Sequence, residues 1–156
     1  MKHNLVSLDV VRFCAEECFR QHSGELSVAD MVNAWIFCYQ EMDANVLCIE
    51  DILELGRRVE PVKNKDGFRQ VPVLIDGRQV GVPTLVLINQ VTLLIDAVNE
   101  GLVTPTELYE EFERIHPFID GNGRVGAILF NWANGELDDP TVPPKVNWTS
   151  ERSWAR

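Results

Sequence analysis

The sequence predicts an all-α protein, a bundle of about six helices that carries one β-hairpin. Apolar residues recur at helical spacing through most of the chain, and these segments begin or end at capping residues, glycine or proline. A hairpin pattern occurs at one place, on both sides of Asp76-Gly77. The 156 residues suffice for one domain with a real core and are too few for two ordinary domains.

Three helices are expected in the first part of the chain. The first covers residues 7–20 and has Ser7 as its cap. The second begins at Ser27, which stands three residues before Asp30 in an arrangement like a capping box. The third, shorter helix covers residues 49–59. Each of them places apolar residues on one face, which the core should cover.

A β-hairpin is expected in the middle of the chain. Asp76-Gly77 is a dipeptide typical of tight two-residue turns, and residues 68–75 and 78–80 flank it as strands. Pro72 would restrict the first strand to the edge of a sheet. A solitary hairpin in a helical protein has no sheet to join, so helices should hold it in place.

The second half of the chain predicts three further helices. A long one, residues 83–99, starts with a proline. The next opens with a capping box of Thr104 and Glu107 and ends at His116, which precedes a proline. The last, residues 125–133, is strongly apolar and should be buried.

The nine residues 116–124, His-Pro-Phe-Ile-Asp-Gly-Asn-Gly-Arg, connect the last two predicted helices. Gly121 and Gly123 let backbone amides approach a ligand at the start of a helix, where the helix dipole favours an anion. Asn122 adds a neutral amide donor, and Arg124 adds a planar guanidinium suited to phosphate oxygens. This connection is therefore expected to bind phosphate.

Two more side chains of the same connection add chemistry to the phosphate site. Asp120 is an oxygen ligand for Mg²⁺, which usually binds through one carboxylate together with phosphate oxygens. His116 could accept the proton of an incoming hydroxyl, because the ordinary pKa of imidazole lies near neutrality. An anion site, a metal ligand and a general base thus occur together.

This connection resembles the signature HPFx(D/E)GNGR of the Fic family, in the Fic/Doc superfamily, and matches every defined position. The resemblance extends over roughly residues 49–134, and it includes the hairpin, which in Fic proteins is a flap over the active site that aligns the target. Members mostly transfer AMP from ATP to a hydroxyl of a target protein. The resemblance thus implies a Fic-type adenylyltransferase with Mg²⁺ as cofactor and ATP as co-substrate.

The resemblance also implies a role for each matching residue. His116 would be the catalytic base, and Arg124, also counted as catalytic, would hold the outer phosphates. Asp120 would bind Mg²⁺, and Phe118 would anchor the loop in the core. The α- and β-phosphates would be held by Gly121, Asn122 and Gly123. The target would dock on the flap at Val73, Leu74 and Ile75.

The chain departs from the family pattern at Ala127, where many adenylylating members carry a second arginine that holds the terminal phosphate. ATP is therefore expected to bind only slightly more tightly than ADP, unless another basic residue such as Arg69 or Arg78 takes over. Gly123 stands where the kinase-like Doc branch has lysine. The glycine at this position therefore favours AMP transfer. Residues 96–101 come close to the family's inhibitory motif without matching it, so any restraint would come from a separate inhibitory protein or from the tail.

Composition limits the partners and the compartment. The net charge of −10 disfavours nucleic acid or an anionic membrane surface as the main partner. No apolar run is long enough to span a membrane and the first residues lack a signal-peptide pattern, so a cytoplasmic protein is expected. The four cysteines show no CxxC spacing and should be free and mostly buried.

The predicted organisation is a single Fic-type domain over residues 1–135, followed by a tail over residues 136–156. Within the domain, N-terminal helices occupy residues 1–60, the flap residues 67–81 and the core helices residues 83–135. The leading function is AMP transfer to a Tyr, Ser or Thr hydroxyl of a protein. The alternatives are the same site with another phosphate donor or the reverse reaction, and a silent interaction module.

Overall fold

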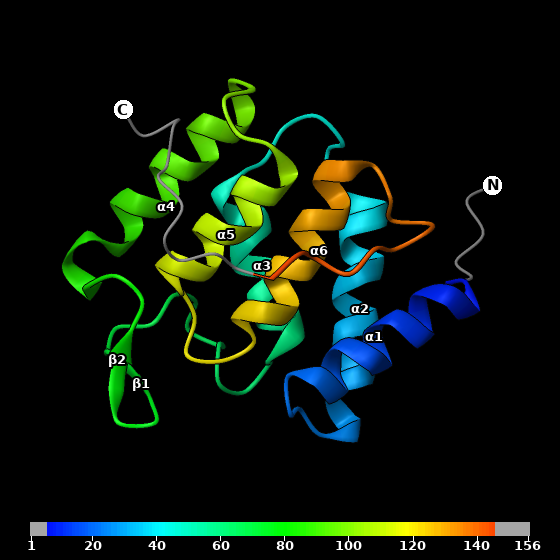
Figure 1. Ribbon diagram of the computed structural model, residues 1–156, viewed down its shortest axis with the longest axis horizontal. Helices are drawn as coiled ribbons and strands as arrows, with labels where there is room; N and C mark the ends of the chain where they lie inside the picture. Colours follow the sequence, from blue (N-terminus) through cyan, green and yellow to red (C-terminus); the bar gives the residue numbers. More distant parts are fainter. Residues whose placement is uncertain (1–5, 146–156) are drawn as a thin grey trace.

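A computed structural model describes residues 6–145, which form six helices and one two-stranded hairpin (Figure 1). In chain order the elements are α1 (Leu8–Arg20), α2 (Glu25–Glu41), α3 (Ile49–Val59), β1 (Val73–Ile75), β2 (Arg78–Val80), α4 (Thr84–Asn99), α5 (Pro105–Ile115) and α6 (Asn122–Asn134). The predicted all-α class with a hairpin is confirmed. Within the described part of the chain, every helix is too short or too polar to cross a membrane.

Several helix ends lie where the capping residues predict them. The Ser7 hydroxyl accepts a hydrogen bond of 3.3 Å from the amide of Val10 and so caps α1. Thr104 and Glu107 form the predicted capping box of α5, with two hydrogen bonds of 3.1 Å. Helix α3 has the predicted bounds.

Helix α2 begins earlier than predicted, and the proposed capping box of Ser27 and Asp30 is wrong. Its N-cap is Gly24, in extended conformation, and Glu25 is the first helical residue. The amide of Ser27 already donates to the carbonyl of Gly24 at 3.0 Å. Glu25 in the first turn interacts favourably with the helix dipole, which helps the helix to start there.

Helix α6 also begins earlier than predicted, at Asn122 rather than Val125. Gly121 adopts a left-handed conformation with φ 79° and becomes the N-cap. The last three residues of the connection therefore form the first turn of the helix. Their backbone amides are those that lack partners within a helix, so a helix N-terminus of the kind that suits an anion lies inside the sequence motif.

The hairpin forms at the predicted turn, with Asp76 at φ 51° and Gly77 at φ 75°. Val73 pairs with Val80 in the antiparallel register. The predicted first strand, residues 68–75, is too long, because only Val73–Ile75 is strand. Residues before it pair with the motif instead, as the amide of Arg69 donates to the carbonyl of Pro117 at 2.9 Å.

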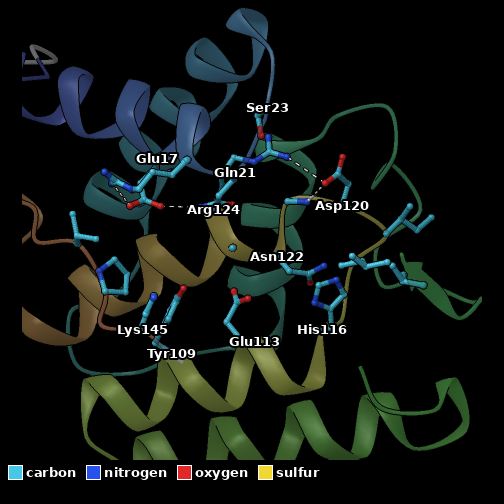
Figure 2. Close-up of a pocket in the computed structure, with 18 of the residues that line it drawn as sticks. Glu17, Gln21, Ser23, Tyr109, Glu113, His116, Asp120, Asn122, Arg124 and Lys145 are labelled. Carbon is cyan, nitrogen blue, oxygen red and sulfur yellow. Dashed lines mark hydrogen bonds and ion pairs between the residues drawn. The ribbon is translucent and has the colours of Figure 1, made fainter. Parts of the chain in front are cut away.

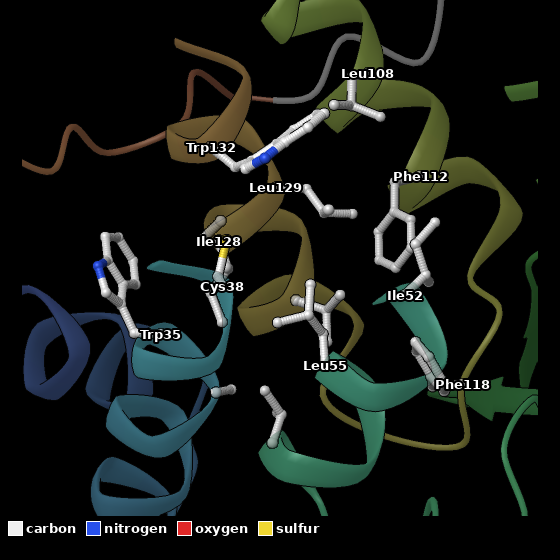
Figure 3. Packing of buried hydrophobic residues seen from close by; sticks show 14 of the residues in the cluster. Trp35, Cys38, Ile52, Leu55, Leu108, Phe112, Phe118, Ile128, Leu129 and Trp132 are labelled. Carbon is white, nitrogen blue, oxygen red and sulfur yellow. The ribbon is translucent and has the colours of Figure 1, made fainter. Parts of the chain in front are cut away.

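Buried residues of all six helices form the core, and Figure 3 shows its part between α2, α3, α5 and α6. Trp35, Phe112 and Phe118 are among its largest fully buried side chains. The four cysteines are free, and three of them are buried while Cys48 is exposed, which confirms the prediction. This core fixes the two helices, α5 and α6, that bracket the motif.

Part of the predicted tail packs on the helical body. After Gly135 ends α6 with φ 68°, the carbonyl of Leu137 accepts a hydrogen bond of 3.0 Å from the indole of Trp35. Leu137 is partly buried against the core. Residues 146–156 of the predicted tail lie outside the described residues.

Candidate active site

A cavity of about 640 Å³ opens beside the motif (Figure 2). Its walls come from the end of α1, the hairpin, α5, the motif with the first turn of α6, and residues 142–145. The structure brings all the predicted site residues to this one cavity, namely Val73, Leu74, Ile75, His116, Asp120, Gly121, Asn122, Gly123 and Arg124.

The motif loop is held by one aromatic ring and one amide. Phe118 is fully buried, and its ring lies so close to Gly56 of α3 that a Cβ atom there would be 2.2 Å away. The side chain of Asn122 accepts from the amide of Phe118 at 2.8 Å and donates to its carbonyl at 2.9 Å. Both polar atoms of the Asn122 side chain are thus used to close the loop. Of Asn122, only the backbone amide remains available to a phosphate.

His116 ends α5 in a left-handed conformation with φ 53°. Its backbone carbonyl accepts a hydrogen bond of 2.6 Å from Nε of Arg69. Burial lowers the pKa of His116, and the positive charge of Arg69 lowers it further. The ring hydrogen bonds to the backbone of Glu113. A neutral imidazole that donates to a carbonyl with one nitrogen keeps the other as a proton acceptor.

Asp120 stands among cationic side chains at the rim of the cavity. Its carboxylate contacts the Lys63 ammonium at 2.6 Å and the Arg124 guanidinium at 3.5 Å. Burial by itself raises the pKa of Asp120, but the hydrogen bonds from Lys63 and from the amide of Gly121 outweigh it, so the pKa lies below its ordinary value. Asp120 is therefore ionised at neutral pH.

This carboxylate fits a Mg²⁺ ligand. It is ionised, its side chain is 41% exposed, and two cationic groups already gather at its oxygens. No cluster of three or more metal-binding side chains occurs among the described residues. Mg²⁺ would therefore take its other ligands from phosphate and water, as it commonly does, and Lys63 would have to leave Asp120.

Arg124 is buried and already paired. Its guanidinium contacts the Glu60 carboxylate at 2.8 Å, and its side chain is 2% exposed. The same nitrogen lies 3.5 Å from Asp120, while the second terminal nitrogen reaches the carbonyl of Val59 at 3.4 Å. A phosphate bound in the cavity would compete with Glu60 for this guanidinium.

Sequence reasoning missed the residues that α1 contributes to the cavity. A Cβ atom on Gly123 would lie 2.4 Å from Oε1 of Gln21, so the amide oxygen of Gln21 covers the glycine of the predicted phosphate site. Gln21 is held there by a hydrogen bond of 2.8 Å to Glu17, which is buried and ion-paired with Arg20. No local signal in α1 marks these residues.

Sequence reasoning also missed Tyr109 and Glu113, which line the cavity from α5 together with His116. Figure 2 shows Tyr109 and Glu113 on this helix and His116 at its end. Their spacing could have revealed them, since residues three, four and seven apart share one helix face. Oε1 of Glu113 is buried and has no hydrogen-bond partner among the described residues. Burial raises the pKa of Glu113 to about 7, and the charge of Glu17 adds to the shift.

Replacing Glu113 with glutamine should stabilise the protein above pH 7. A carboxyl whose pKa is about 7 in the folded state and near 4.5 when unfolded lowers stability as pH rises through that window. Glu113→Gln should therefore raise the free energy of unfolding at pH 8 by roughly 3 kcal/mol and leave it nearly unchanged at pH 4. Urea unfolding at both pH values tests this, with the exposed Glu16→Gln as control. A gain of equal size at both would contradict it.

Ala127 does not face the predicted phosphate site. It is fully buried in the hydrophobic core and is absent from the cavity wall. The two basic residues proposed as substitutes do not line the cavity either. Arg69 is 3% exposed and donates to backbone carbonyls, and Arg78 is exposed on β2. An arginine at position 127 would require the surrounding packed side chains to move.

The Fic/DOC family model matches residues 47–133, more than half of the chain. The matched range contains α3, the hairpin, α4, α5, the motif and nearly all of α6. A comparison with curated proteins gives no match.

Solved Fic structures share the fold. A segment of Fic-1 from C. elegans aligns with 25% identity and a TM-score of 0.61, over 91% of this chain and 47% of that one. A variant of that segment gives 26% identity and a TM-score of 0.57, over 90% and 46%. A signalling protein with a Fic domain from Bacteroides thetaiotaomicron gives 22% and 0.53, over 85% and 57%. The chain spans about half the length of these relatives.

Proposed function

Because the chain belongs to the Fic/DOC family, we propose that it transfers AMP from ATP to a side-chain hydroxyl of a target protein. The observation that carries the proposal is the environment of His116. Its pKa is lowered by burial, its ring is oriented by the backbone of Glu113, and it faces the cavity that Asp120 and Gly123 also line. A neutral, oriented imidazole suits a general base.

In the proposed reaction, His116 accepts the proton of a Tyr, Ser or Thr hydroxyl. The hydroxyl oxygen bonds to the α-phosphorus, the bond from that phosphorus to the bridging oxygen breaks, and pyrophosphate leaves. Amides at the start of α6, at Gly123 and its neighbours, would stabilise the phosphate charge. Mg²⁺, when bound at Asp120, supplies positive charge where negative charge develops.

A Fic-fold module without turnover is the second candidate. Two features favour it, because Gln21 lies over the Cα side of Gly123 and Glu60 pairs with Arg124, so protein side chains occupy space and charge that a phosphate would use. Another phosphate donor or the reverse cleavage remain alternatives within the enzyme class. A target protein is the proposed partner, together with a separate inhibitory protein, since residues 96–99 of the near-match to the inhibitory motif belong to α4.

Labelled nucleotides distinguish these candidates. The full chain is incubated with Mg²⁺ and labelled ATP, GTP, CTP or UTP, alone and with cell lysate, and modified proteins are located by gel and mass spectrometry. AMP transfer predicts label from ATP labelled in the adenine or α-phosphate and none from ATP labelled in the γ-phosphate. Transfer of the γ-phosphate would replace the proposal with kinase chemistry, and no transfer would favour the silent module.

The hairpin should serve the target rather than the fold. Leu74 and Ile75 are more than half exposed yet line the cavity, and a short edge strand can pair with an extended segment. Replacing Val73, Leu74 and Ile75 by glycine should therefore reduce modification of a protein target far more than self-modification or nucleotide binding. The exposed Leu102→Gly is the control. Equal losses in all three assays would show that the hairpin supports the fold.

A further inference from the structure

Among the described residues, the arginine and lysine side chains that line the cavity are Arg20, Arg124 and Lys145. Arg20 is ion-paired with Glu17, and Arg124 with Glu60. Lys145 makes no ion pair with another described residue. Because Ala127 replaces the second arginine and is buried in the core, Lys145 is, in the described part of the wall, the lysine or arginine without an ion pair that could meet an outer phosphate.

Lys145 reaches the cavity because the chain after α6 is tied back to that helix. Asn131 is fully buried, and its side chain makes two hydrogen bonds to the backbone of Thr141. Its nitrogen donates to the carbonyl at 3.0 Å, and its oxygen accepts from the amide at 2.8 Å. The hydroxyl of Thr141 also donates to Glu136 at 2.7 Å. A buried amide with both groups paired to one residue is a rigid attachment.

The residues between this attachment and Lys145 are stiff. Val142, Pro143 and Pro144 follow Thr141, and two successive prolines restrict the backbone to extended conformations. All three line the cavity wall together with Lys145. Figure 2 shows Lys145 near Tyr109, with Asp120 at the other side of the cavity in that view. The lysine is thus held at the cavity by a short, inflexible segment.

We propose that Lys145, positioned by the bonds between Asn131 and Thr141, binds the outermost phosphate of the nucleotide. The inference rests on the proposed function, because it requires a nucleoside triphosphate in this cavity. It replaces the sequence-based expectation that ATP binds only slightly more tightly than ADP. A lysine contributes a point charge to a phosphate, whereas an arginine contributes two parallel donors. Because charge is what the contact needs, Lys145→Arg should preserve the preference for ATP over ADP.

Calorimetric titration of the full chain with ATP, ADP and AMP, each with Mg²⁺, tests the proposal. Lys145→Gln should weaken ATP binding about tenfold, the usual size of one charge-assisted contact, and leave AMP binding within about twofold of the parent. The control is Lys65→Gln, at an exposed lysine outside the cavity wall, and it should change none of the three affinities.

The role of the attachment is tested by Asn131→Asp, which keeps the size of the side chain but cannot donate to the Thr141 carbonyl. It should weaken ATP binding as Lys145→Gln does, and the double variant should lose no more than either single one. If Asn131→Asp does not fold, Thr141→Pro removes the other of the two hydrogen bonds.

The outcomes separate this inference from the proposed function. A parent that binds none of the three nucleotides overturns both. A parent that binds ATP, with Lys145→Gln weakening all three nucleotides equally or none of them, overturns the role of Lys145 and leaves the proposed function standing.

Discussion

Replacing His116 with alanine should lower the rate of AMP transfer by about 100- to 10,000-fold, the usual contribution of a positioned general base. Nucleotide binding should stay close to that of the parent, because the imidazole is bonded to the backbone of Glu113 rather than to an anion-binding group. Single-turnover kinetics with labelled ATP measure the rate, and calorimetry measures the affinity. Such a split is the mark of a group that acts in the transition state.

Two variants protect this experiment against a folding artefact. Asparagine tolerates left-handed backbone better than alanine, so His116→Asn removes the base while suiting φ 53°. The control is His22→Ala, at an exposed histidine that also has a positive φ of 56° but does not line the cavity. Transfer by either His116 variant at the parental rate would remove His116 from the mechanism.

Replacing Arg69 with methionine should destabilise the protein by about 3 kcal/mol or more, because several buried carbonyls would lose their donor at once. The guanidinium is 3% exposed, and it donates to the carbonyls of His116 at 2.6 Å, Val82 at 2.5 Å and Ile115 at 3.3 Å. Methionine preserves much of the packing volume, so the loss reports the hydrogen bonds. Urea unfolding at pH 7 gives the free energy.

The same variant should raise the pKa of His116, because the positive charge of Arg69 lowers it in the parent. An NMR titration of the imidazole, run under conditions where the variant is folded, detects this change. Arg78→Met, at the exposed arginine of β2, is the matched control and should change neither quantity. Unaltered stability of Arg69→Met would mean that water can replace the guanidinium.

Local signals predicted local structure well. The capping box of Thr104 and Glu107 fixed the start of α5, because both side chains bond to backbone within one turn. The same kind of pattern failed at Ser27 and Asp30, since Gly24 offered an earlier start and neither side chain was required. A capping pattern shows that a helix can begin at a given residue. Where an equally good start lies upstream, the helix begins there instead.

The site could be predicted where it is contiguous in sequence and not where it is assembled by packing. The nine neighbouring residues 116–124 predict a phosphate site, a metal ligand and a general base together. The cavity also needs Gln21 from α1 and Lys145 from the segment after α6, and contacts across the fold deliver both. The sequence suggests Arg69 as a possible phosphate ligand on the flap, but its side chain is buried and donates to backbone carbonyls. Such placements depend on tertiary contacts that no local pattern records.

Phe118 and Gly56 occupy a space that admits only one side chain. Ring atoms of Phe118 lie 2.2 Å from where a Cβ of residue 56 would stand. A larger residue at position 56 of α3 would therefore require a smaller residue at position 118 of the loop. Transplanting residues 116–124 into another helical scaffold would therefore fail without a bare helix surface to receive the ring. The portable unit is the loop together with one turn of α3.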